Sequence, residues 1–147
     1  MNDQANWEIR LKKILKDFGC QTGTIHQTTG EGKILKLVAQ IGVPASLLDK
    51  ISLIPFGKGI AGVAAERGEA VELCNLQEDL EGVAKVDARK TGVSGSLAVP
   101  IFSAIGHQVI GTLGIGKFAP YEFSDEEKSR LKSFARDLAA HFGDKPD

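Results

Sequence analysis

A glycine-rich segment with an embedded lysine, GKGIAG at residues 57–62, contains residue types that could bind phosphate. Gly57, Gly59 and Gly62 have the GxGxxG spacing of dinucleotide-binding turns, whose backbone N–H groups contact a pyrophosphate. The segment does not match a P-loop, because Lys58 lies between the glycines and no serine or threonine follows. We therefore interpret Gly57 and Gly59 as turn residues, and Gly62 as a residue that permits close packing of a helix on a sheet.

The two cysteines, Cys20 and Cys74, are too few for a disulfide framework. Cys74 has no histidine and no second cysteine near it in the sequence, so no neighbouring group that would activate its thiol is visible. The favoured interpretation of Cys74 is a small buried apolar residue. The alternative is a thiol that faces a cavity and has a lowered pKa.

The three histidines, His26, His107 and His141, are scattered, and no Cys/His spacing matches a metal site. His26 lies on a predicted strand, on the same face as Thr24 and Thr28. If that face is buried, His26 is a polar group of a pocket. We favour the alternative, in which the face is exposed and His26 is an ordinary surface residue.

A polar stretch, EGVAKVDARKTGVSGS at residues 81–96, holds the strongest candidates for ligand contacts. Cationic side chains and hydroxyls beside glycine N–H groups are suited to a polar or anionic small molecule. The alternative is a solvated loop whose charged side chains pair at the surface. With Cys74 as a lining residue, the candidate ligand-binding residues are Cys74, Lys85, Asp87, Arg89, Thr91, Ser94 and Ser96. No catalytic residue, metal ligand or cofactor is assigned.

These candidates must be positioned by elements that the hydrophobic pattern predicts. Helices are expected at about 5–18 and 124–142, and the second of these starts with the capping box Ser124–Glu127. The residues 21–41 read as a hairpin, in which Leu35, Leu37, Ala39 and Ile41 share one face. Short helices are expected after Pro44 and over 59–67, and further strands at 51–55, 70–74, 96–102 and 107–117.

This order of elements favours an α+β domain with a largely antiparallel sheet and helices packed on its face, because few helices are available to connect parallel strands. We expect one domain over 1–147. The net charge of −1, from 18 basic and 19 acidic side chains, gives no field that would attract nucleic acid or an anionic membrane. The sequence shows no apolar run long enough for a membrane span and no signal peptide, so we expect a soluble cytoplasmic protein.

The arrangement as a whole resembles the GAF domain family. The similarity covers nearly the whole chain and is carried by several weak segments in the right order: IPFGKGIAGVAAERGEAVELCNL (54–76), SLAVPIF (96–102), HQVIGTLGIGK (107–117) and FSDEEKSRLKSFARDLA (123–139). The resemblance implies a GAF/PAS-like, six-stranded antiparallel sheet with the N- and C-terminal helices on one face. The short helices and the variable loop would cover a ligand pocket on the other face.

Family resemblance does not fix the ligand, because GAF domains bind many kinds of small molecule. Bilin-binding and cyclic-nucleotide-binding motifs are absent here. The segment IPFGKGIAG is similar to that of free methionine-(R)-sulfoxide reductases, which have cysteines in G-[RK]-G-V-C-G and I-A-C-D segments. The first of these positions is Ala61 in this chain, and the second falls near Lys85 or Val86. Both catalytic cysteines are missing, so this activity is expected to be absent.

Three hypotheses for the function follow. The leading one is a stand-alone GAF domain that senses a small molecule, has no catalysis of its own, and signals through a protein partner, as a homodimer formed by its terminal helices. The second is a diverged reductase or another thiol enzyme that uses Cys74. The third is an interaction or dimerisation domain whose interior is filled by its own side chains. A cavity would favour the first hypothesis over the third.

Overall fold

The computed structural model describes residues 3–29, 33–73, 95–103 and 108–142. These residues form a six-stranded sheet in the order β3-β2-β1-β6-β5-β4, and every neighbouring pair is antiparallel. The strands are β1 (Thr22–Thr28), β2 (Ile34–Ile41), β3 (Leu53–Pro55), β4 (Val71–Leu73), β5 (Gly95–Phe102) and β6 (Val109–Lys117). The helices are α1 (Asp3–Phe18), α2 (Leu48–Ser52), α3 (Gly59–Arg67) and α5 (Asp125–Phe142), with a 3-10 turn, η1 (Ala45–Leu47). The predicted α+β class is confirmed.

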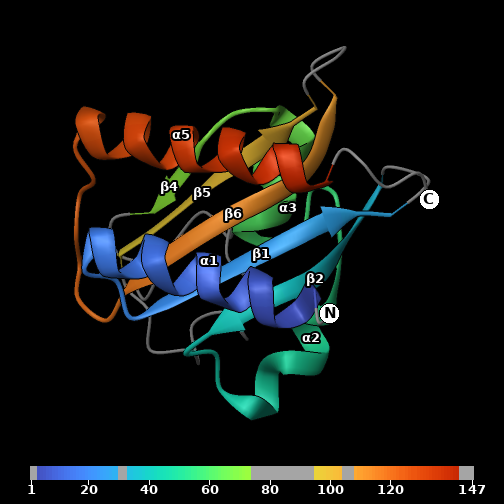
Figure 1. The fold of residues 1–147 in the computed structure, drawn as a ribbon, viewed down its shortest axis with the longest axis horizontal. Helices are drawn as coiled ribbons and strands as arrows, with labels where there is room; N and C mark the ends of the chain where they lie inside the picture. Colours follow the sequence, from blue (N-terminus) through green and yellow to red (C-terminus); the bar gives the residue numbers. More distant parts are fainter. Residues whose placement is uncertain (1–2, 30–32, 74–94, 104–107, 143–147) are drawn as a thin grey trace.

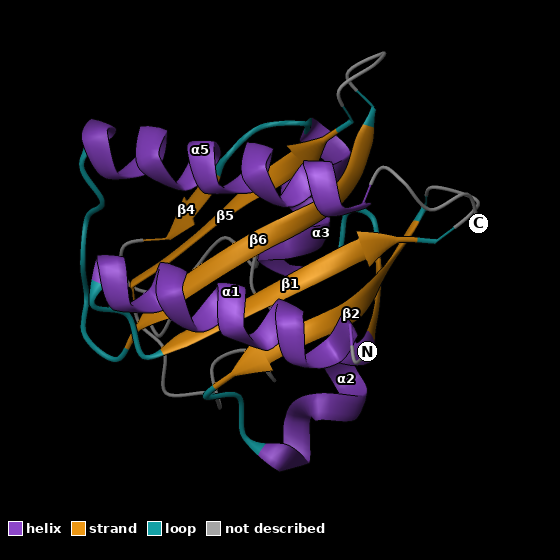
Figure 2. Ribbon diagram, in the orientation of Figure 1, coloured by secondary structure: helices purple, strands orange, loops and turns teal. Residues whose placement is uncertain are grey.

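Helices cover both faces of this sheet. The two long helices, α1 and α5, lie on one face, and α3 lies on the other (Figure 1). The short helix α2 lies beside β2 and β3 at one end of the sheet (Figure 2). The layers are therefore helix, sheet and helix, and the second face is covered only by short elements in the described part of the chain.

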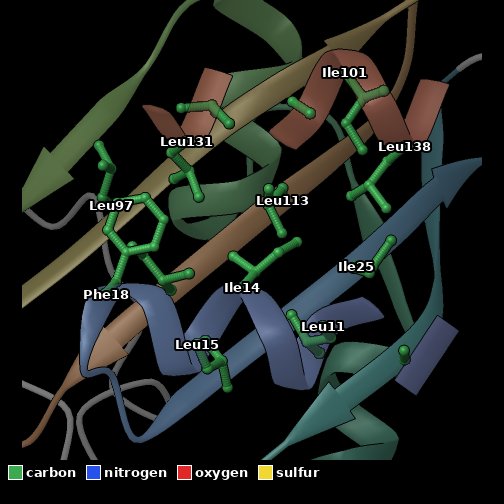
Figure 3. Close-up of a cluster of buried hydrophobic side chains, with 14 of the residues drawn as sticks. Leu11, Ile14, Leu15, Phe18, Ile25, Leu97, Ile101, Leu113, Leu131 and Leu138 are labelled. Carbon is green, nitrogen blue, oxygen red and sulfur yellow. The ribbon is translucent and has the colours of Figure 1, made fainter. Parts of the chain in front are cut away.

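The main hydrophobic core lies between the sheet and the two long helices (Figure 3). The apolar stripe of α1 is buried at Leu11, Ile14, Leu15 and Phe18, as its helical spacing predicts. Gly19, with φ 65°, ends this helix in the left-handed conformation. Burial of each such large side chain contributes about 1.5–3 kcal/mol. The buried members from the other elements are Ile25, Ala39, Leu97, Val99, Ile101, Leu113, Ile115, Phe123, Leu131, Ala135, Leu138 and Phe142.

The predicted apolar stripe of β2 is wrong, because the strand contains a bulge. Ile25 pairs with Ala39, but His26 pairs with Leu37, so Val38 is an extra residue. One extra residue reverses the alternation of faces along the strand. Ala39 therefore faces α1 with Ile25, whereas Leu37 turns to the other face with His26.

Three contacts outside the core hold the long helices in place. Lys117 on β6 donates hydrogen bonds to the carbonyl oxygens of Phe18 and Gly19 at the end of α1, at 3.0 and 3.2 Å. At the edge of the sheet, Glu72 forms an ion pair with Lys128 at 2.8 Å, which attaches β4 to the first turns of α5.

Among the described helices, none combines the length and the apolar character that a membrane span requires.

The predicted capping box is present at the start of α5. The Glu127 N–H donates to Ser124 Oγ at 3.0 Å, and the Ser124 N–H donates to Glu127 Oε1 at 2.8 Å. The Tyr121 hydroxyl also donates to the same carboxylate. The hydrogen bonds that the carboxylate accepts, the one from the Ser124 backbone first, lower the pKa of Glu127, while burial acts in the opposite direction. The cap fixes where the last helix begins.

Replacing this cap is expected to have a moderate cost. Ser124→Ala removes the acceptor for the Glu127 N–H and should reduce the free energy of unfolding by about 1 kcal/mol in a urea titration. Ser129→Ala is the matched control, because Ser129 is exposed further along the same helix. Alanine favours the helix interior, so this control should be neutral or slightly stabilising. Equal effects of the two substitutions would contradict a role of the cap in stability.

Candidate functional site

The sheet face turned away from α1 and α5 forms the floor of a cavity. Side chains of this face alternate along each strand with Ile25, Leu113 and Leu97, which belong to the main core. Across β1, β6 and β5 the paired residues of this face form three rows: Thr22–Gly116–Ser96, Thr24–Gly114–Ala98 and His26–Thr112–Pro100. Small and hydroxyl-bearing residues thus make up most of the floor.

The glycines of β6 leave room above this floor. Gly114 lies between Thr24 and Ala98, and it lines the cavity. A Cβ atom at Gly114 would lie 3.1 Å from Thr24 Oγ1, so even alanine would press on that hydroxyl. Gly114 and Gly116 therefore leave the cavity face of β6 without side chains beyond Thr112.

Two short segments complete the cavity, which has a volume of about 310 Å³. This volume is at the lower end of the range for small-molecule sites. The connection from β2 to β3 contributes Val43, Leu47, Lys50 and Ile51. The segment from β3 into α3 contributes Leu53, Ile54, Pro55, Lys58, Gly59, Ile60 and Ala61.

The glycine-rich segment supports this wall, as its predicted role requires. Gly57 and Gly59 have φ values of 87° and 66°, a conformation that glycine adopts without strain. Gly62 lies against the preceding strand, where an added Cβ would be 2.5 Å from the Pro55 carbonyl oxygen. The strand before the segment, β3, pairs antiparallel with β2. This pairing excludes the dinucleotide-binding unit, which requires parallel strands.

The expectation that His26 is exposed at the surface is wrong. Its side chain is 1% exposed and lines the cavity. The face that carries Thr24 and His26 looks solvated in the sequence because it is polar, but it is the floor of a cavity whose walls include residues of α2 and α3. A polar cavity and a polar surface give the same alternation along a strand.

The ring of His26 has a defined hydrogen-bonding state. Its Nε2 lies 2.9 Å from the carbonyl oxygen of Ile51 in α2. Burial lowers the pKa of His26, so the ring is favoured in its neutral form. Because a carbonyl oxygen only accepts, Nε2 must carry the hydrogen, and Nδ1 is left as an acceptor. Neither Nδ1 nor the adjacent Thr112 Oγ1 has a hydrogen-bond partner in the described residues.

The charges of the described lining are of one sign. Lys50 and Lys58 are the ionised side chains among the lining residues, and no aspartate or glutamate lies with them. The start of α3 also contributes through Gly59, Ile60 and Ala61. The first N–H groups of a helix have no partner within it, and they carry partial positive charge. The cavity therefore favours negative charge at its α3 side.

The structure describes only one of the predicted ligand-binding residues. Ser96 lies on β5 and lines the cavity. The other candidates lie outside the described residues: Cys74, Lys85, Asp87, Arg89, Thr91 and Ser94. His26 and Lys58 were not among the predicted ligand contacts. The alternation of Thr22, Thr24 and His26 on one face of β1 was the available signal for His26. The position of Lys58 just before a helix was the signal for the lysine.

Neither metal nor thiol chemistry is indicated by the described part of the chain. No group of three or more metal-ligating side chains occurs among its residues. Cys20 follows α1 and is not among the lining residues of the cavity. Burial raises the pKa of Cys20 to about 11, which keeps the thiol protonated and unreactive at neutral pH.

A comparison with protein-family models decides the family. The model described as the GAF domain matches residues 10–142. This chain belongs to the GAF domain family. The match includes the strands of the cavity floor and the glycine-rich wall. A search of curated proteins gives no significant match.

Solved structures confirm the GAF fold. The GAF domain from a phosphoenolpyruvate-protein phosphotransferase of Coxiella burnetii is 21% identical, with a TM-score of 0.80 over 96% of this chain and 82% of that chain. The free methionine-R-sulfoxide reductase of Neisseria meningitidis is 20% identical, with a TM-score of 0.74 over 96% and 78%. The type II enzyme of Thermoplasma acidophilum is 17% identical, with a TM-score of 0.74 over 93% and 89%. At these identities the similarity establishes the fold alone.

Proposed function

We propose that this GAF domain binds a small molecule in the cavity and acts as a sensor or regulatory module without catalysis of its own. The observation that carries the proposal is a cavity of about 310 Å³ whose floor contains buried polar side chains. Ligand sites typically combine mostly apolar walls with a few fixed polar groups, and this cavity has both. An interaction domain filled by its own side chains would not need such a space.

The buried polar atoms give further support. Leaving a buried polar atom without a partner costs about 1–3 kcal/mol. His26 Nδ1 and Thr112 Oγ1 are two such atoms in the described residues, and both lie on the cavity side of the sheet. A purely structural role for this face would more simply be met by apolar residues.

Thiol catalysis has less support than sensing. Ala61 occupies the position at which the resemblance to the reductases places a cysteine, and Ala61 lines the cavity. The chain therefore has a methyl group where those enzymes would have a thiol. Cys74, the residue that the alternative hypothesis requires, lies outside the described residues.

The proposal extends to how a signal leaves the domain. We propose a cytoplasmic domain that signals through a protein partner and forms a homodimer through α1 and α5. The exposed side of α1 carries Ile9, which is 54% exposed, among charged residues. Six further proposed ligand contacts lie outside the described residues. They are Lys85, Asp87, Arg89, Thr91 and Ser94, with Cys74 as a lining residue.

Native mass spectrometry of freshly purified protein, compared with its denatured mass, tests both parts. We expect a retained small molecule that dissociates on denaturation, and a mass about twice the chain mass of 15.7 kDa. Ala61→Leu should reduce retention, because the larger side chain occupies cavity volume, while Ala119→Leu, exposed after β6 and outside both long helices, is the control. Retention that is unchanged in Ala61→Leu would place the ligand elsewhere and contradict the proposal.

A further inference from the structure

The floor of the cavity includes bare main chain, which restricts the shape of a ligand that rests on it. Gly23 and Ile115 both line the cavity. The Ile115 side chain belongs to the main core, and a Cβ at Gly23 would lie 2.7 Å from Leu15 Cδ2, on the α1 side of the sheet. These two residues are paired across β1 and β6, so a patch of backbone from both strands faces the cavity.

This patch belongs to a flat area of the sheet. Two adjacent rows of the cavity face hold no side chain larger than threonine: Thr24–Gly114–Ala98 and Thr22–Gly116–Ser96. Two residues along a strand span about 7 Å, and the three strands span about 10 Å. The next row, which starts with His26, ends the area with larger side chains. An area of this size matches a pair of fused rings.

Aliphatic side chains form the cover of this area. The helix α3 packs on β5 and β6 (Figure 1), and its residues Ile60 and Ala61 line the cavity. Ile54 on β3 and Val43 after β2 line it as well. A ligand between the bare floor and these side chains gains stability mainly from dispersion and from burial of its apolar surface.

A flat ring makes better use of such a floor than a puckered ring. All atoms of an aromatic ring can touch a flat surface at once, whereas alternate atoms of a saturated ring lie farther away. A gap of about 0.5–1 Å already loses a quarter to a half of the dispersion attraction between two atoms. The cavity volume of about 310 Å³, at the lower end for ligand sites, limits the ligand to a small ring system.

The polar side chains beside the flat area suit hydrogen-bonding groups on the edge of a ring. Thr22 and Thr24 stand on the β1 side of the glycines of β6, and Ser96 stands on the β5 side. Each hydroxyl can donate or accept a hydrogen bond. The described lining residues include no acidic side chain, so a buried cation would have no partner among them.

We propose that the cavity binds a flat, bicyclic heteroaromatic compound without positive charge, which lies on the main chain at Gly23, Gly114 and Ile115 and turns its polar edge to the hydroxyls. This inference rests on the proposed function, because it takes the cavity to be a ligand site. Gly114 is the residue that keeps the floor flat, since a side chain there would stand up between Thr24 and Ala98.

Four compounds test this proposal by isothermal titration calorimetry. They are quinolin-2-one, which is flat; decahydroquinolin-2-one, the same lactam on puckered rings; 1-methylquinolin-2-one, which lacks the N–H donor; and 1-methylquinolinium, which is flat but cationic. We expect quinolin-2-one to bind about tenfold more tightly than the puckered lactam, because more of its atoms contact the floor. Loss of the donor should weaken binding about fivefold, and positive charge should weaken it more than about tenfold.

Variants assign these effects to residues. Gly114→Ala should weaken binding of quinolin-2-one about tenfold and of the puckered lactam much less, so the preference for the flat compound is lost. The double variant Thr24→Val, Ser96→Ala should remove the difference between quinolin-2-one and its methylated form. Thr28→Val is the matched control, because Thr28 is on β1 but not among the lining residues, and it should change nothing. Melting temperatures of the free variants identify any loss of folding, and the comparison of compounds on the wild type does not depend on them.

The results that would overturn this proposal differ from failure of the proposed function. If the puckered lactam or the cation binds as tightly as quinolin-2-one, the ligand class is wrong but the cavity remains a ligand site. A loss in Gly114→Ala that is equal for the flat and the puckered lactam would show that the floor does not select flat rings. If none of the four compounds binds, the proposed ligand class also fails. Retention of another molecule in native mass spectrometry would then keep the sensor proposal, whereas an empty protein would remove the support for both.

Discussion

Gly62→Val is expected to reduce the free energy of unfolding by about 3 kcal/mol, because it forces a side chain against backbone atoms. An added Cβ would lie 2.5 Å from the Pro55 carbonyl oxygen and 3.2 Å from the Gly57 nitrogen. Neither atom can move easily, since the Gly57 N–H donates to the Gly62 carbonyl at 2.8 Å and β3 is paired with β2. The loop and the helix would have to separate, and both form the cavity wall.

The neighbouring glycine provides the control for this prediction. Gly59 has a left-handed φ of 66°, but a Cβ there would meet nothing within 4 Å. Gly59→Ala should therefore cost only about 1–2 kcal/mol, the price of the backbone conformation for an L-residue. Chemical denaturation of both variants measures the difference. If Gly62→Val proves as stable as Gly59→Ala, close packing of α3 on β3 is not the reason for glycine at 62.

The glycine-rich segment also shows what sequence reasoning can provide. The alternatives for GKGIAG were a phosphate-binding turn and a structural turn with a packing glycine, and the arrangement of the other elements distinguished between them. Too few helices were available for a parallel sheet, and this disfavoured the dinucleotide-binding unit, which the antiparallel pairing of β3 then excluded. The long helices and the capping box were predictable for a similar reason, because each depends on local spacing that the sequence states directly.

Features that depend on pairing between distant residues were not predictable. The bulge at Val38 changes which face Leu35 and Leu37 share, and its position is visible only in the register of β2 against β1. The same applies to the burial of His26, whose ring contacts the carbonyl of Ile51 in α2, 25 residues further along the chain. Strand periodicity gives the two faces of a strand, but it does not show what covers them.

Acidification is expected to destabilise the protein through His26. Its folded pKa is lowered from the ordinary value of 6.5, mainly by burial, although the hydrogen bond to Ile51 acts in the opposite direction. Lys50 and Lys58, which line the same cavity, add positive charge on the side of α2 and α3. A protonated ring would be buried without an acidic partner among the described lining residues.

The sign of the effect follows from proton linkage. Well above pH 6.5 the ring is neutral in both the folded and the unfolded states, so the contribution of His26 does not vary with pH there. As the pH falls below 6.5, the unfolded chain binds a proton that the folded chain still excludes. The free energy of unfolding then decreases, with a slope of up to about 1.4 kcal/mol per pH unit. The decrease from His26 ends once the pH falls below its lowered folded pKa.

Urea titrations of the wild type and of His26→Gln between pH 5 and pH 8 measure this contribution. Glutamine can donate to the Ile51 carbonyl but cannot take up a proton in this range, so the variant should lose the part of the pH dependence that belongs to His26. His141, which is exposed on α5, is retained in both proteins, and its contribution cancels in the comparison. Parallel curves for the two proteins would mean that the buried ring accepts a proton as readily as in the unfolded chain. The neutral form of His26, with its hydrogen on Nε2 toward the Ile51 carbonyl, would then be wrong.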